Sequence, residues 1–277
     1  MSTIKYFIGQ VFHWLAEADG GYRGLIGKRP VRVKQAGDEL QVTPGAEVAV
    51  ARYFALDHDL EAICASFPAD PTMSQALAFC RGLRLIRQPL WECLATFLTS
   101  AMKQVPHIRQ MSYAIRQRFG QQVPGWEGLA TYPEPERLAR ATEAELRACG
   151  LGFRAKNLLG TARAVADGVV DLEAIRAMDD EAAIAELCRL PGVGPKIANC
   201  ALLFGYERLR AFPIDVWIER VLRKSYFAKK RNVTAKQLRD FAADSFGPYG
   251  GYAQQYLFHH ARTRSPTGRL KTSGEQL

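Results

Sequence analysis

Two residues at predicted helix starts carry the strongest indication of chemistry in this chain. Lys196 follows a turn rich in glycine and proline in the stretch LPGVGPKIANC. Asp215 stands further along, in AFPIDVWIERVL, directly before an amphipathic run that predicts another helix. A nucleophilic amine beside a carboxylate is suited to attack at an electron-poor carbon, with charge stabilisation alongside. The pair therefore predicts covalent catalysis by an amine.

The position of Lys196 within its helix favours a reactive amine. Pro195 suits the first helical position, where its missing N–H needs no partner, so Lys196 takes the second. A positive charge is disfavoured at a helix N-terminus, which favours the neutral, nucleophilic amine. The consecutive backbone N–H groups of the turn also form a site for a phosphate or a bridging cation. The alternative interpretation is that Lys196 only contacts a phosphate.

Asp215 and Cys200 each have a structural interpretation as well. Aspartate is a favoured N-cap residue, so Asp215 taken alone would be a helix cap. Cys200 lies four residues after Lys196 and faces the same side of the helix, but a lone cysteine is most often a core residue. The combination of the amine and the carboxylate is what favours the catalytic interpretation.

The elements that must position these residues change character along the chain. Short runs rich in β-branched and aromatic residues alternate with turn sequences and predict a small antiparallel sheet in residues 1–56. These runs are IKYFIGQVFHW, YRGLIG, PVRVKQ, ELQVT and AEVAVARYF. Apolar residues then recur at helical spacing and predict about ten helices over residues 57–264, and residues 265–277 predict a polar tail. We therefore expect an α+β protein whose helical part holds the site.

Composition narrows the classes of partner. Of the 277 residues, 48% are hydrophobic and 23% are charged, which is ordinary for a folded globular protein. The net charge of +9 favours a polyanion as partner, either a nucleic acid or an anionic membrane surface. No stretch reaches the length of a membrane helix, about eighteen uncharged apolar residues, and the N-terminus lacks a signal peptide, so we expect a cytosolic chain. The six cysteines are scattered singly without metal-ligand spacing, so we expect reduced thiols and no metal site.

The hairpin and its downstream aspartate resemble the defining motif of the helix-hairpin-helix DNA glycosylases, and within them the 8-oxoguanine DNA glycosylases. LPGVGPKIANC and PIDVW are similar to the stretch of glycine and proline and to the aspartate of that superfamily. Five further segments resemble stretches of the 8-oxoguanine enzymes in the same order: IGQVFHW, ARYFALD, RQPLWECLATFLTS, GLGFRAKNL and FGPYGGYAQQYLF. The resemblance covers roughly residues 4–262 and implies a TATA-binding-protein-like β-domain joined to a helical helix-hairpin-helix glycosylase body.

The resemblance implies a reaction on damaged double-stranded DNA. Such an enzyme bends the duplex and flips the damaged nucleotide into a pocket, because the target atom is unreachable inside the stack. Lys196 would then displace the base at C1′ and form a Schiff base with the sugar, and β-elimination would nick the strand. Asp215 would stabilise the positive charge that develops on the sugar. The implied protein is a bifunctional DNA glycosylase and AP lyase that acts as a monomer in base excision repair.

Four positions match the family's pocket for the flipped base. Gly9 matches the glycine whose backbone carbonyl accepts the N7 proton of 8-oxoguanine, a proton that guanine lacks. With guanine bound, that acceptor would be buried and unpaired, so one carbonyl discriminates between the two bases. Cys200 and Phe258 match the residues that stack on the two faces of the lesion, and Gln254 matches the one that hydrogen-bonds its Watson–Crick edge. Without the resemblance, Phe258 would be interpreted as a core residue.

The hairpin implies a contact with the DNA backbone and a reaction that requires no cofactor. By the resemblance, Gly192, Val193 and Gly194 contact the DNA. Family analogy allows a monovalent cation or Mg²⁺ at the hairpin carbonyls near Val193, with water as the alternative occupant. The sequence lacks the four-cysteine pattern of the related endonuclease III branch, so no iron–sulfur cluster is expected.

The residues that would contact the opposite base depart from the family. Where the family has an asparagine-rich run and a later arginine, this chain has Met102 and His107. Met102 could still fill the gap in the stack as an apolar plug. Arg154 matches the family's set, Phe153 stands where an aromatic wedge is usual, and Trp217 stands where a histidine near the phosphate is frequent. The departures leave the preference for cytosine opposite the lesion open.

Two alternatives to an 8-oxoguanine glycosylase and lyase stay open. One is a related base excision enzyme with an altered range of lesions or opposite bases. The other is a non-catalytic protein that binds damaged DNA and uses the hairpin as a phosphate clamp. The joint presence of Lys196, Asp215, Gly9 and Phe258 favours the enzymes, because phosphate binding does not need these four together.

Overall fold

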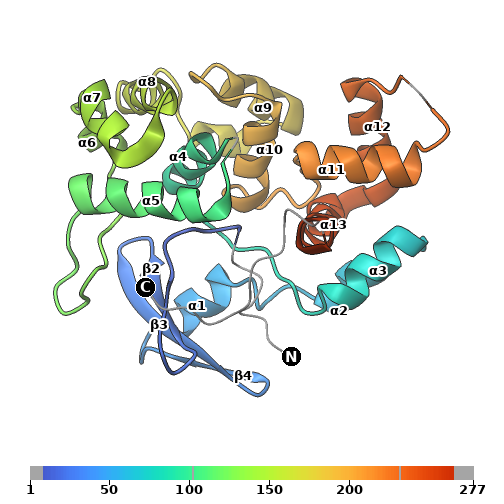
Figure 1. Cartoon of the computed structure of the whole chain (residues 1–277), viewed down its shortest axis with the longest axis horizontal. Coiled ribbons are helices and arrows are strands. Elements are labelled where there is room, and N and C mark those ends of the chain that lie inside the picture. The colour runs from blue at the N-terminus through green and yellow to red at the C-terminus, as the bar shows by residue number, and fades with distance from the viewer. Residues whose placement is uncertain (1–8, 102, 231, 265–277) are drawn as a thin grey trace.

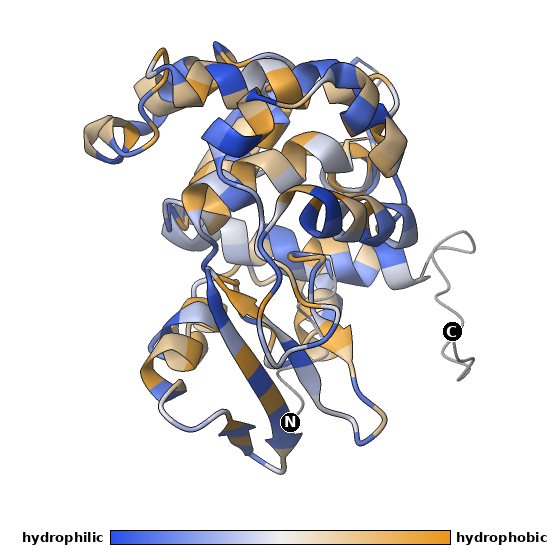
Figure 2. Cartoon of the chain, turned by 90° about the vertical axis from the view of Figure 1, so that its left-hand side faces the viewer, coloured by the Kyte–Doolittle hydropathy of each residue, from blue (hydrophilic) through white to orange (hydrophobic). Residues whose placement is uncertain are grey.

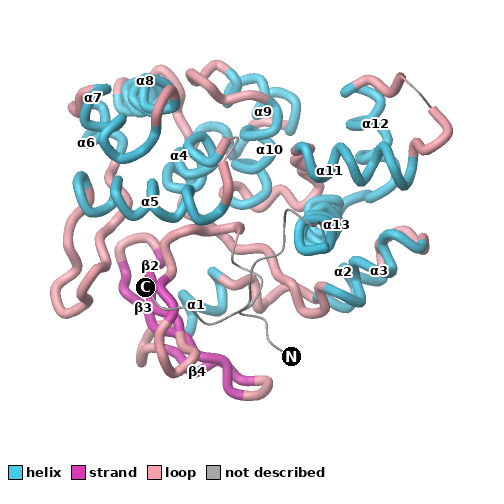
Figure 3. Tube along the Cα trace, in the orientation of Figure 1, coloured by secondary structure: helices cyan, strands magenta, loops and turns pink. Residues whose placement is uncertain are grey.

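A small antiparallel sheet lies against a larger helical body (Figure 1). The computed structural model describes residues 9–101, 103–230 and 232–264, so Met102 and the predicted tail lie outside the described residues. Figure 3 shows the strands gathered at one side of the molecule, below α5 (Val105–Phe119), with helices forming most of the rest. The predicted α+β architecture, a sheet followed by helices, is confirmed.

The sheet is a meander of four strands in the order β1-β2-β3-β4. Their bounds are Leu15–Ala16, Tyr22–Ile26, Arg29–Ala36 and Glu39–Val42. The β2–β3 hairpin closes with Ile26 opposite Arg29, which leaves Gly27 and Lys28 as a two-residue turn. Gly27 has a φ of 60°, as the first turn residue of a type II′ hairpin requires, and glycine adopts it without strain. Hydrophilic and hydrophobic residues alternate along the strands in Figure 2, which is typical of a sheet with one buried face.

A small core lies between the sheet and α1 (Glu47–Tyr53). Val31 and Trp14 contribute to this core and are almost completely buried. The predicted strand over AEVAVARYF is wrong, because this segment forms α1. Val50 and Tyr53 lie three residues apart and both face the core, which a helix allows and an alternating strand does not.

Helices form most of the remaining chain and surround α4 (Leu90–Ser100). Every residue of α4 from Glu92 to Thr99 is buried, with α8 and α10 packed against it. The other helices are α2 (Leu60–Ala65), α3 (Pro71–Phe79), α6 (Pro135–Ala139), α7 (Glu143–Leu146), η2 (Arg147–Leu151), α8 (Arg154–Ala166), η3 (Ala174–Ala177), α9 (Asp180–Cys188), α10 (Pro195–Phe204), α11 (Val216–Val221), η4 (Leu222–Tyr226), α12 (Ala235–Phe246), η5 (Gly247–Tyr249) and α13 (Gly250–Arg264). Within the described ranges, none of the helices has the length and apolar character needed to cross a membrane.

A buried glutamine ties the start of the described chain to the segment that leads into α4. The Nε2 of Gln10 donates to the backbone carbonyl of Arg84 at 3.0 Å, and its Oε1 accepts from the N–H of Ile86 at 2.8 Å. The backbone carbonyl of Gln10 accepts in turn from Nε2 of Gln88 at 2.9 Å. Gln10, the residue directly after Gly9, is therefore anchored by both its side chain and its carbonyl.

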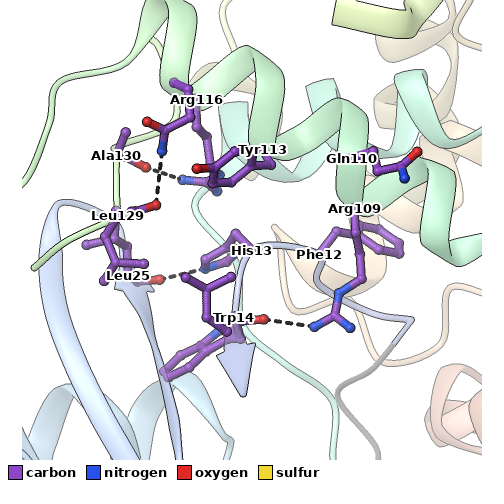
Figure 4. Close-up of a pocket in the computed structure, with 13 residues that line it drawn as sticks. Phe12, His13, Trp14, Leu25, Arg109, Gln110, Tyr113, Arg116, Leu129 and Ala130 are labelled. Carbon is purple, nitrogen blue, oxygen red and sulfur yellow. Dashed lines mark hydrogen bonds between the residues drawn. The ribbon is translucent and has the colours of Figure 1, made fainter. Parts of the chain in front are cut away.

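A buried ion pair and a cavity lie where the sheet meets α4 and α5. Arg116 of α5 pairs with Glu92 of α4, and Nδ1 of His13 lies 3.3 Å from a carboxylate oxygen of Glu92. Burial, with Arg116 nearby, lowers the pKa of His13 to about 4, so its ring is neutral at neutral pH. The adjacent cavity has a volume of about 240 Å³, and Trp14, Arg109 and Tyr113 are among its lining residues (Figure 4). None of the described residues of the predicted active site lines it, so the cavity is separate from the candidate chemistry.

Candidate active site

A tight hairpin joins α9 to α10 and sets the position of Lys196. The N–H of Val193 donates to the carbonyl of Leu190 at 3.1 Å and closes the turn. Gly192 has a φ of 80°, and a Cβ there would lie 2.4 Å from Nδ2 of Asn157 on α8, so only glycine fits. Pro195 is the first residue of α10, which confirms the predicted helix start and places Lys196 at the second position.

Lys196 is half-buried between α10 and α4. Its Nζ lies 5.5 Å from the centre of the Phe97 ring on α4. The amine also approaches the thiol of Cys200, one turn along α10. Burial raises the pKa of the Cys200 thiol, and the nearby Lys196 only partly opposes this effect, so the thiol is neutral at neutral pH. The arrangement places the amine beside an aromatic face and an uncharged sulfur.

Asp215 caps α11 and lies close enough to Lys196 for the two charges to interact. Its Oδ1 accepts from the N–H of Trp217 at 3.0 Å and from the N–H of Ile218 at 2.9 Å, which confirms the predicted N-cap. Burial raises the pKa of Asp215, while the Ile218 N–H, the Lys196 amine and the Trp217 N–H lower it. The two residues that sequence reasoning paired are therefore brought together by two separate helix starts.

Three of the four residues predicted to bind the flipped base, Gly9, Gln254 and Phe258, come from the two ends of the described chain, and the fourth, Cys200, lies on α10. Gly9 has a φ of 120°, and a Cβ there would lie 3.0 Å from Nη1 of Arg262 on α13. The same guanidinium lies 5.3 Å from the centre of the Phe258 ring, one turn earlier on α13. Arg262 also lies within electrostatic range of Asp215. Arg262 therefore lies close to Gly9 and Phe258 and within electrostatic range of Asp215, and the sequence analysis did not predict a role for it.

Gln254 lies on the same helix and contacts Pro213, in the irregular segment that leads to Asp215. Its Nε2 donates to the carbonyl of Pro213 at 2.8 Å, and its Oε1 accepts from Nε2 of Gln255 at 2.6 Å. Gln254 is buried. These contacts link α13 to the chain segment that enters the α11 cap.

The residues predicted to contact the opposite base lie at a different place. Arg154 is buried, and its Nε and Nη2 donate to the carbonyl of Ala101 at 2.8 and 2.5 Å. The neighbouring Phe153 is 60% exposed, with the Arg154 guanidinium 4.3 Å from its ring centre. His107 is exposed in the first turn of α5. Arg154 therefore holds the end of α4 in this structure, while the exposed phenyl ring of Phe153 is available to a partner.

Trp217 follows Asp215 on α11 and is half-buried. The Arg220 guanidinium lies 5.4 Å from its ring centre. This places an aromatic ring and a cation directly beside the cap of α11. Whether either one contacts a phosphate stays a prediction.

Phe97 and Arg262 are the two site residues that sequence reasoning missed. The sequence does carry a signal for Arg262. Gln254, Phe258 and Arg262 are spaced by four residues, and residues with this spacing share one face of a helix. Phe97 had no signal of its own, since it is one of several large apolar residues in the α4 sequence LWECLATFLTS. Among the described residues, no group of three His, Cys, Asp or Glu side chains is placed to hold a metal ion.

Two family models match the two parts of the chain. The model for the N-terminal domain of 8-oxoguanine DNA glycosylase matches residues 3–94. The model for the HhH-GPD superfamily of base excision DNA repair proteins matches residues 101–246. The second match contains both Lys196 and Asp215.

Similarity to individual proteins extends over almost the whole chain. A Methanothermobacter thermautotrophicus protein named "Probable N-glycosylase/DNA lyase" is 31% identical over an alignment of 287 positions, gaps included, which covers 92% of this chain and 91% of that protein. The structure of MBOgg1 in complex with a low-affinity DNA ligand has a TM-score of 0.87 at 34% identity, covering 93% of this chain and 90% of the other. Clostridium acetobutylicum 8-oxoguanine glycosylase/lyase, in complex with double-stranded DNA containing cytosine opposite 8-oxoG, has a TM-score of 0.85 at 32% identity, again with 93% and 90% covered.

Proposed function

The chain belongs to the HhH-GPD superfamily of base excision DNA repair proteins, in its 8-oxoguanine glycosylase branch, and we infer its reaction and its site from that membership. It is a bifunctional enzyme that removes 8-oxoguanine from duplex DNA and then cleaves the strand as an AP lyase. The observation that supports the site is the pairing of Lys196 with Asp215 at two helix starts, in electrostatic contact and partly shielded from water.

Lys196 is proposed as the nucleophile. Its neutral amine attacks C1′ of the flipped nucleotide, the bond from C1′ to N9 breaks, and the base leaves with the bonding electrons and the proton that the amine gives up. The C1′–O4′ bond then opens to give a Schiff base between Lys196 and the sugar. Loss of a C2′ proton and cleavage of the C3′–O3′ bond follow as β-elimination, which nicks the strand. The nucleophile is part of the chain, so these steps need no cofactor.

Asp215 is proposed to stabilise the positive charge that develops on the sugar as the base leaves. A preorganised carboxylate is effective there because it needs no reorganisation at the moment of reaction. Two backbone N–H groups hold one of its oxygens, which keeps the carboxylate oriented while the other oxygen is left for the sugar or for Lys196. The Asp215 side chain would therefore have two roles, as the N-cap of α11 and as the carboxylate that stabilises the charge on the sugar.

Gly9, Phe258, Cys200 and Gln254 are proposed to bind the flipped base. The Gly9 carbonyl would accept the N7 proton of 8-oxoguanine, and Phe258 and Cys200 would cover its two faces. The neutral thiol of Cys200 suits contact with a flat heterocycle, because burial of an uncharged sulfur carries no charge-desolvation penalty. Gln254 would contact the Watson–Crick edge.

We expect Gly9→Ala to impair recognition of the lesion. The added Cβ would lie 3.0 Å from Nη1 of Arg262, and a φ of 120° strains any residue with a side chain. Either the Gly9 carbonyl or the guanidinium must move, so kcat/KM for 8-oxoguanine release should fall about tenfold or more, as expected for about 1–3 kcal/mol of backbone strain. Gly37→Ala is the matched control, because Gly37 also has a positive φ, of 61°, but nothing lies within 4 Å of its Cβ position. Equal kcat/KM for both variants would contradict the proposed role of Gly9.

The remaining predicted residues are proposed to contact the duplex around the flipped nucleotide. The hairpin of Gly192, Val193 and Gly194 would contact the DNA at the start of α10, with the N–H groups of Gly192 and Gly194 offered to a phosphate, because the N–H of Val193 donates to the carbonyl of Leu190. The residues proposed to face the opposite base or a nearby phosphate are Phe153, Arg154, Met102, His107 and Trp217. Phe153 fits an inserted wedge because the residue is 60% exposed, and wedges of this kind kink DNA.

The partner is DNA, and we propose that the protein works where the DNA is held, at the nucleoid if the source is bacterial and in the nucleus if it is eukaryotic. We propose that the chain acts as a monomer, since one chain supplies both the amine and the carboxylate. A monovalent cation or Mg²⁺ at the hairpin would be held by backbone carbonyls near Val193. The steps above are independent of that ion.

The function is tested by the range of bases released. Duplexes with a single 8-oxoguanine opposite each of the four bases, a single alkylated base or a single deaminated base are incubated with excess enzyme, and free base and nicked strand are measured separately. We expect 8-oxoguanine to be released and the strand to be nicked at the same position. Release of the alkylated base alone would show an enzyme of altered lesion range, and binding without any release would show a non-catalytic protein.

A further inference from the structure

Arg262 contacts both sides of the proposed base pocket. It is the third residue of the repeat that places Gln254 and Phe258 on one face of α13. Its guanidinium lies against the Phe258 ring and against the backbone of Gly9, which follows from the distances given above. A Cβ at Gly9 would lie 3.0 Å from Nη1, tighter than most Cβ contacts, so the Gly9 backbone and this guanidinium are close neighbours. The arginine therefore joins two segments from opposite ends of the chain at the place where the base must enter.

The charge of Asp215 depends on groups from three helices. Burial raises its pKa, and four groups lower it: the Ile218 N–H, the Lys196 amine, the Trp217 N–H and the Arg262 guanidinium. Asp215 acts on Arg262 in the same way. Burial lowers the pKa of Arg262, and the Asp215 carboxylate opposes that shift. Lys196 cannot supply positive charge at the moment of attack, because the amine must be neutral to act as a nucleophile.

Two further titratable groups beside these residues, Cys200 and His259, are neutral at neutral pH. Burial raises the pKa of the Cys200 thiol on α10, and burial lowers the pKa of His259 on α13 to about 3. Arginine stays protonated throughout the physiological range. Among the described side chains that face Asp215, Arg262 is therefore the cation that remains when Lys196 has lost its proton.

We propose that Arg262 is a positioning residue of the glycosylase reaction. Its guanidinium holds the Gly9 segment against the Phe258 ring and supplies a permanent positive charge toward Asp215 during the attack by Lys196. This role rests on the functions proposed above for Lys196 and Asp215, and it adds a group that does not itself touch the reacting atoms.

The pH dependence of base release tests this role. Single-turnover rates on an 8-oxoguanine duplex are measured from pH 5 to 9 for the wild-type chain, Arg262→Gln, Arg262→Lys and Arg239→Gln, the last removing an exposed arginine on α12. Loss of the charge lets Asp215 take up a proton more readily, so the acid limb of the Arg262→Gln profile should move to higher pH by about half to one unit. Arg262→Lys keeps the charge and should keep the acid limb, with a lower single-turnover rate because an ammonium group does not match the planar guanidinium against Phe258. Arg239→Gln should match the wild type.

The outcomes separate this inference from the proposed function. A folding defect lowers the amount of active enzyme but leaves the midpoint of the acid limb in place, and thermal melting of each variant measures it directly. An unmoved acid limb in Arg262→Gln, or the same shift in Arg262→Lys, would overturn the role of Arg262 while the wild-type activity stands. A wild-type chain that releases no 8-oxoguanine would instead overturn the function from which the role was inferred.

Discussion

Lys196→Gln is expected to bind a duplex with 8-oxoguanine but neither release the base nor nick the strand. Glutamine keeps the length and polarity of the side chain approximately but has no amine to attack C1′, so no Schiff base can form. We expect the single-turnover rate of base release to fall by about 10³-fold or more, as is usual when a covalent nucleophile is removed. Binding is measured by fluorescence anisotropy on the labelled duplex and release by chromatography of the free base.

A second lysine of the chain provides the control for Lys196→Gln. Lys236 is exposed on α12, where its Nζ pairs with Asp240 at 2.7 Å, so Lys236→Gln removes a lysine and a charge at a surface ion pair. Such pairs contribute little to stability, about 0–1 kcal/mol. Lys236→Gln should keep the wild-type rate. Base release by Lys196→Gln at a rate near that of the control would show that another group or water is the nucleophile.

Asp215→Asn is expected to keep the fold and lose most of the rate. Asparagine is as favourable as aspartate at a helix N-cap and accepts the same two backbone N–H groups, so α11 should stay intact. It carries no negative charge to offset the positive charge on the sugar, and loss of one such electrostatic group reduces kcat by about 10²- to 10³-fold. The single-turnover rate and the free energy of unfolding are measured on the same preparation.

The raised pKa of Asp215 decides whether Asp215→Asn stabilises or destabilises the folded protein. An acid whose pKa is higher in the folded than in the unfolded protein favours folding in its protonated form, and that contribution is lost as the pH rises through the folded-state pKa. At neutral pH the ionised carboxylate therefore opposes folding, and Asp215→Asn should unfold at the same or a higher denaturant concentration than the wild type.

Another capping aspartate serves as the matched control for Asp215→Asn. The Oδ1 of Asp179 accepts from the N–H of Ala182 at 2.8 Å at the start of α9, away from the paired residues. Asp179→Asn should leave both the rate and the stability close to wild type. A rate for Asp215→Asn that falls only in proportion to lost stability would mean that Asp215 is a cap and nothing more.

The sequence predicted the elements that depend on local signals. Pro195 after two glycines indicated the start of α10, and Asp215 before an apolar run indicated the cap of α11, because helix termini depend on the residues beside them. The same local reasoning failed at α1. β-branched residues in AEVAVARYF suggested a strand, but the small core of the sheet needs two side chains three residues apart, and a helix provides them.

Contacts between segments that are far apart in the chain could not be predicted from the sequence. Gly9 and Arg262 lie near opposite ends of the chain, and neither the direction of the Gly9 peptide nor the arginine against it has a local signature. Arg154 matched the family pattern for reading the opposite base, yet its guanidinium donates to the carbonyl of Ala101. A sequence match identifies the residue type at a position, whereas the hydrogen bonds of its side chain depend on which backbone the fold brings close.

The most direct test of the account is to identify the residue that becomes covalently attached to DNA. The wild-type chain is mixed with a duplex carrying one 8-oxoguanine in the presence of sodium borohydride, which reduces a Schiff base to a stable secondary amine, and an undamaged duplex serves as control. The digested adduct is then mapped by mass spectrometry. We predict an adduct only on the damaged duplex, with the sugar remnant on Lys196. An adduct on a different residue, or base release with no adduct at all, would contradict Lys196 as the nucleophile.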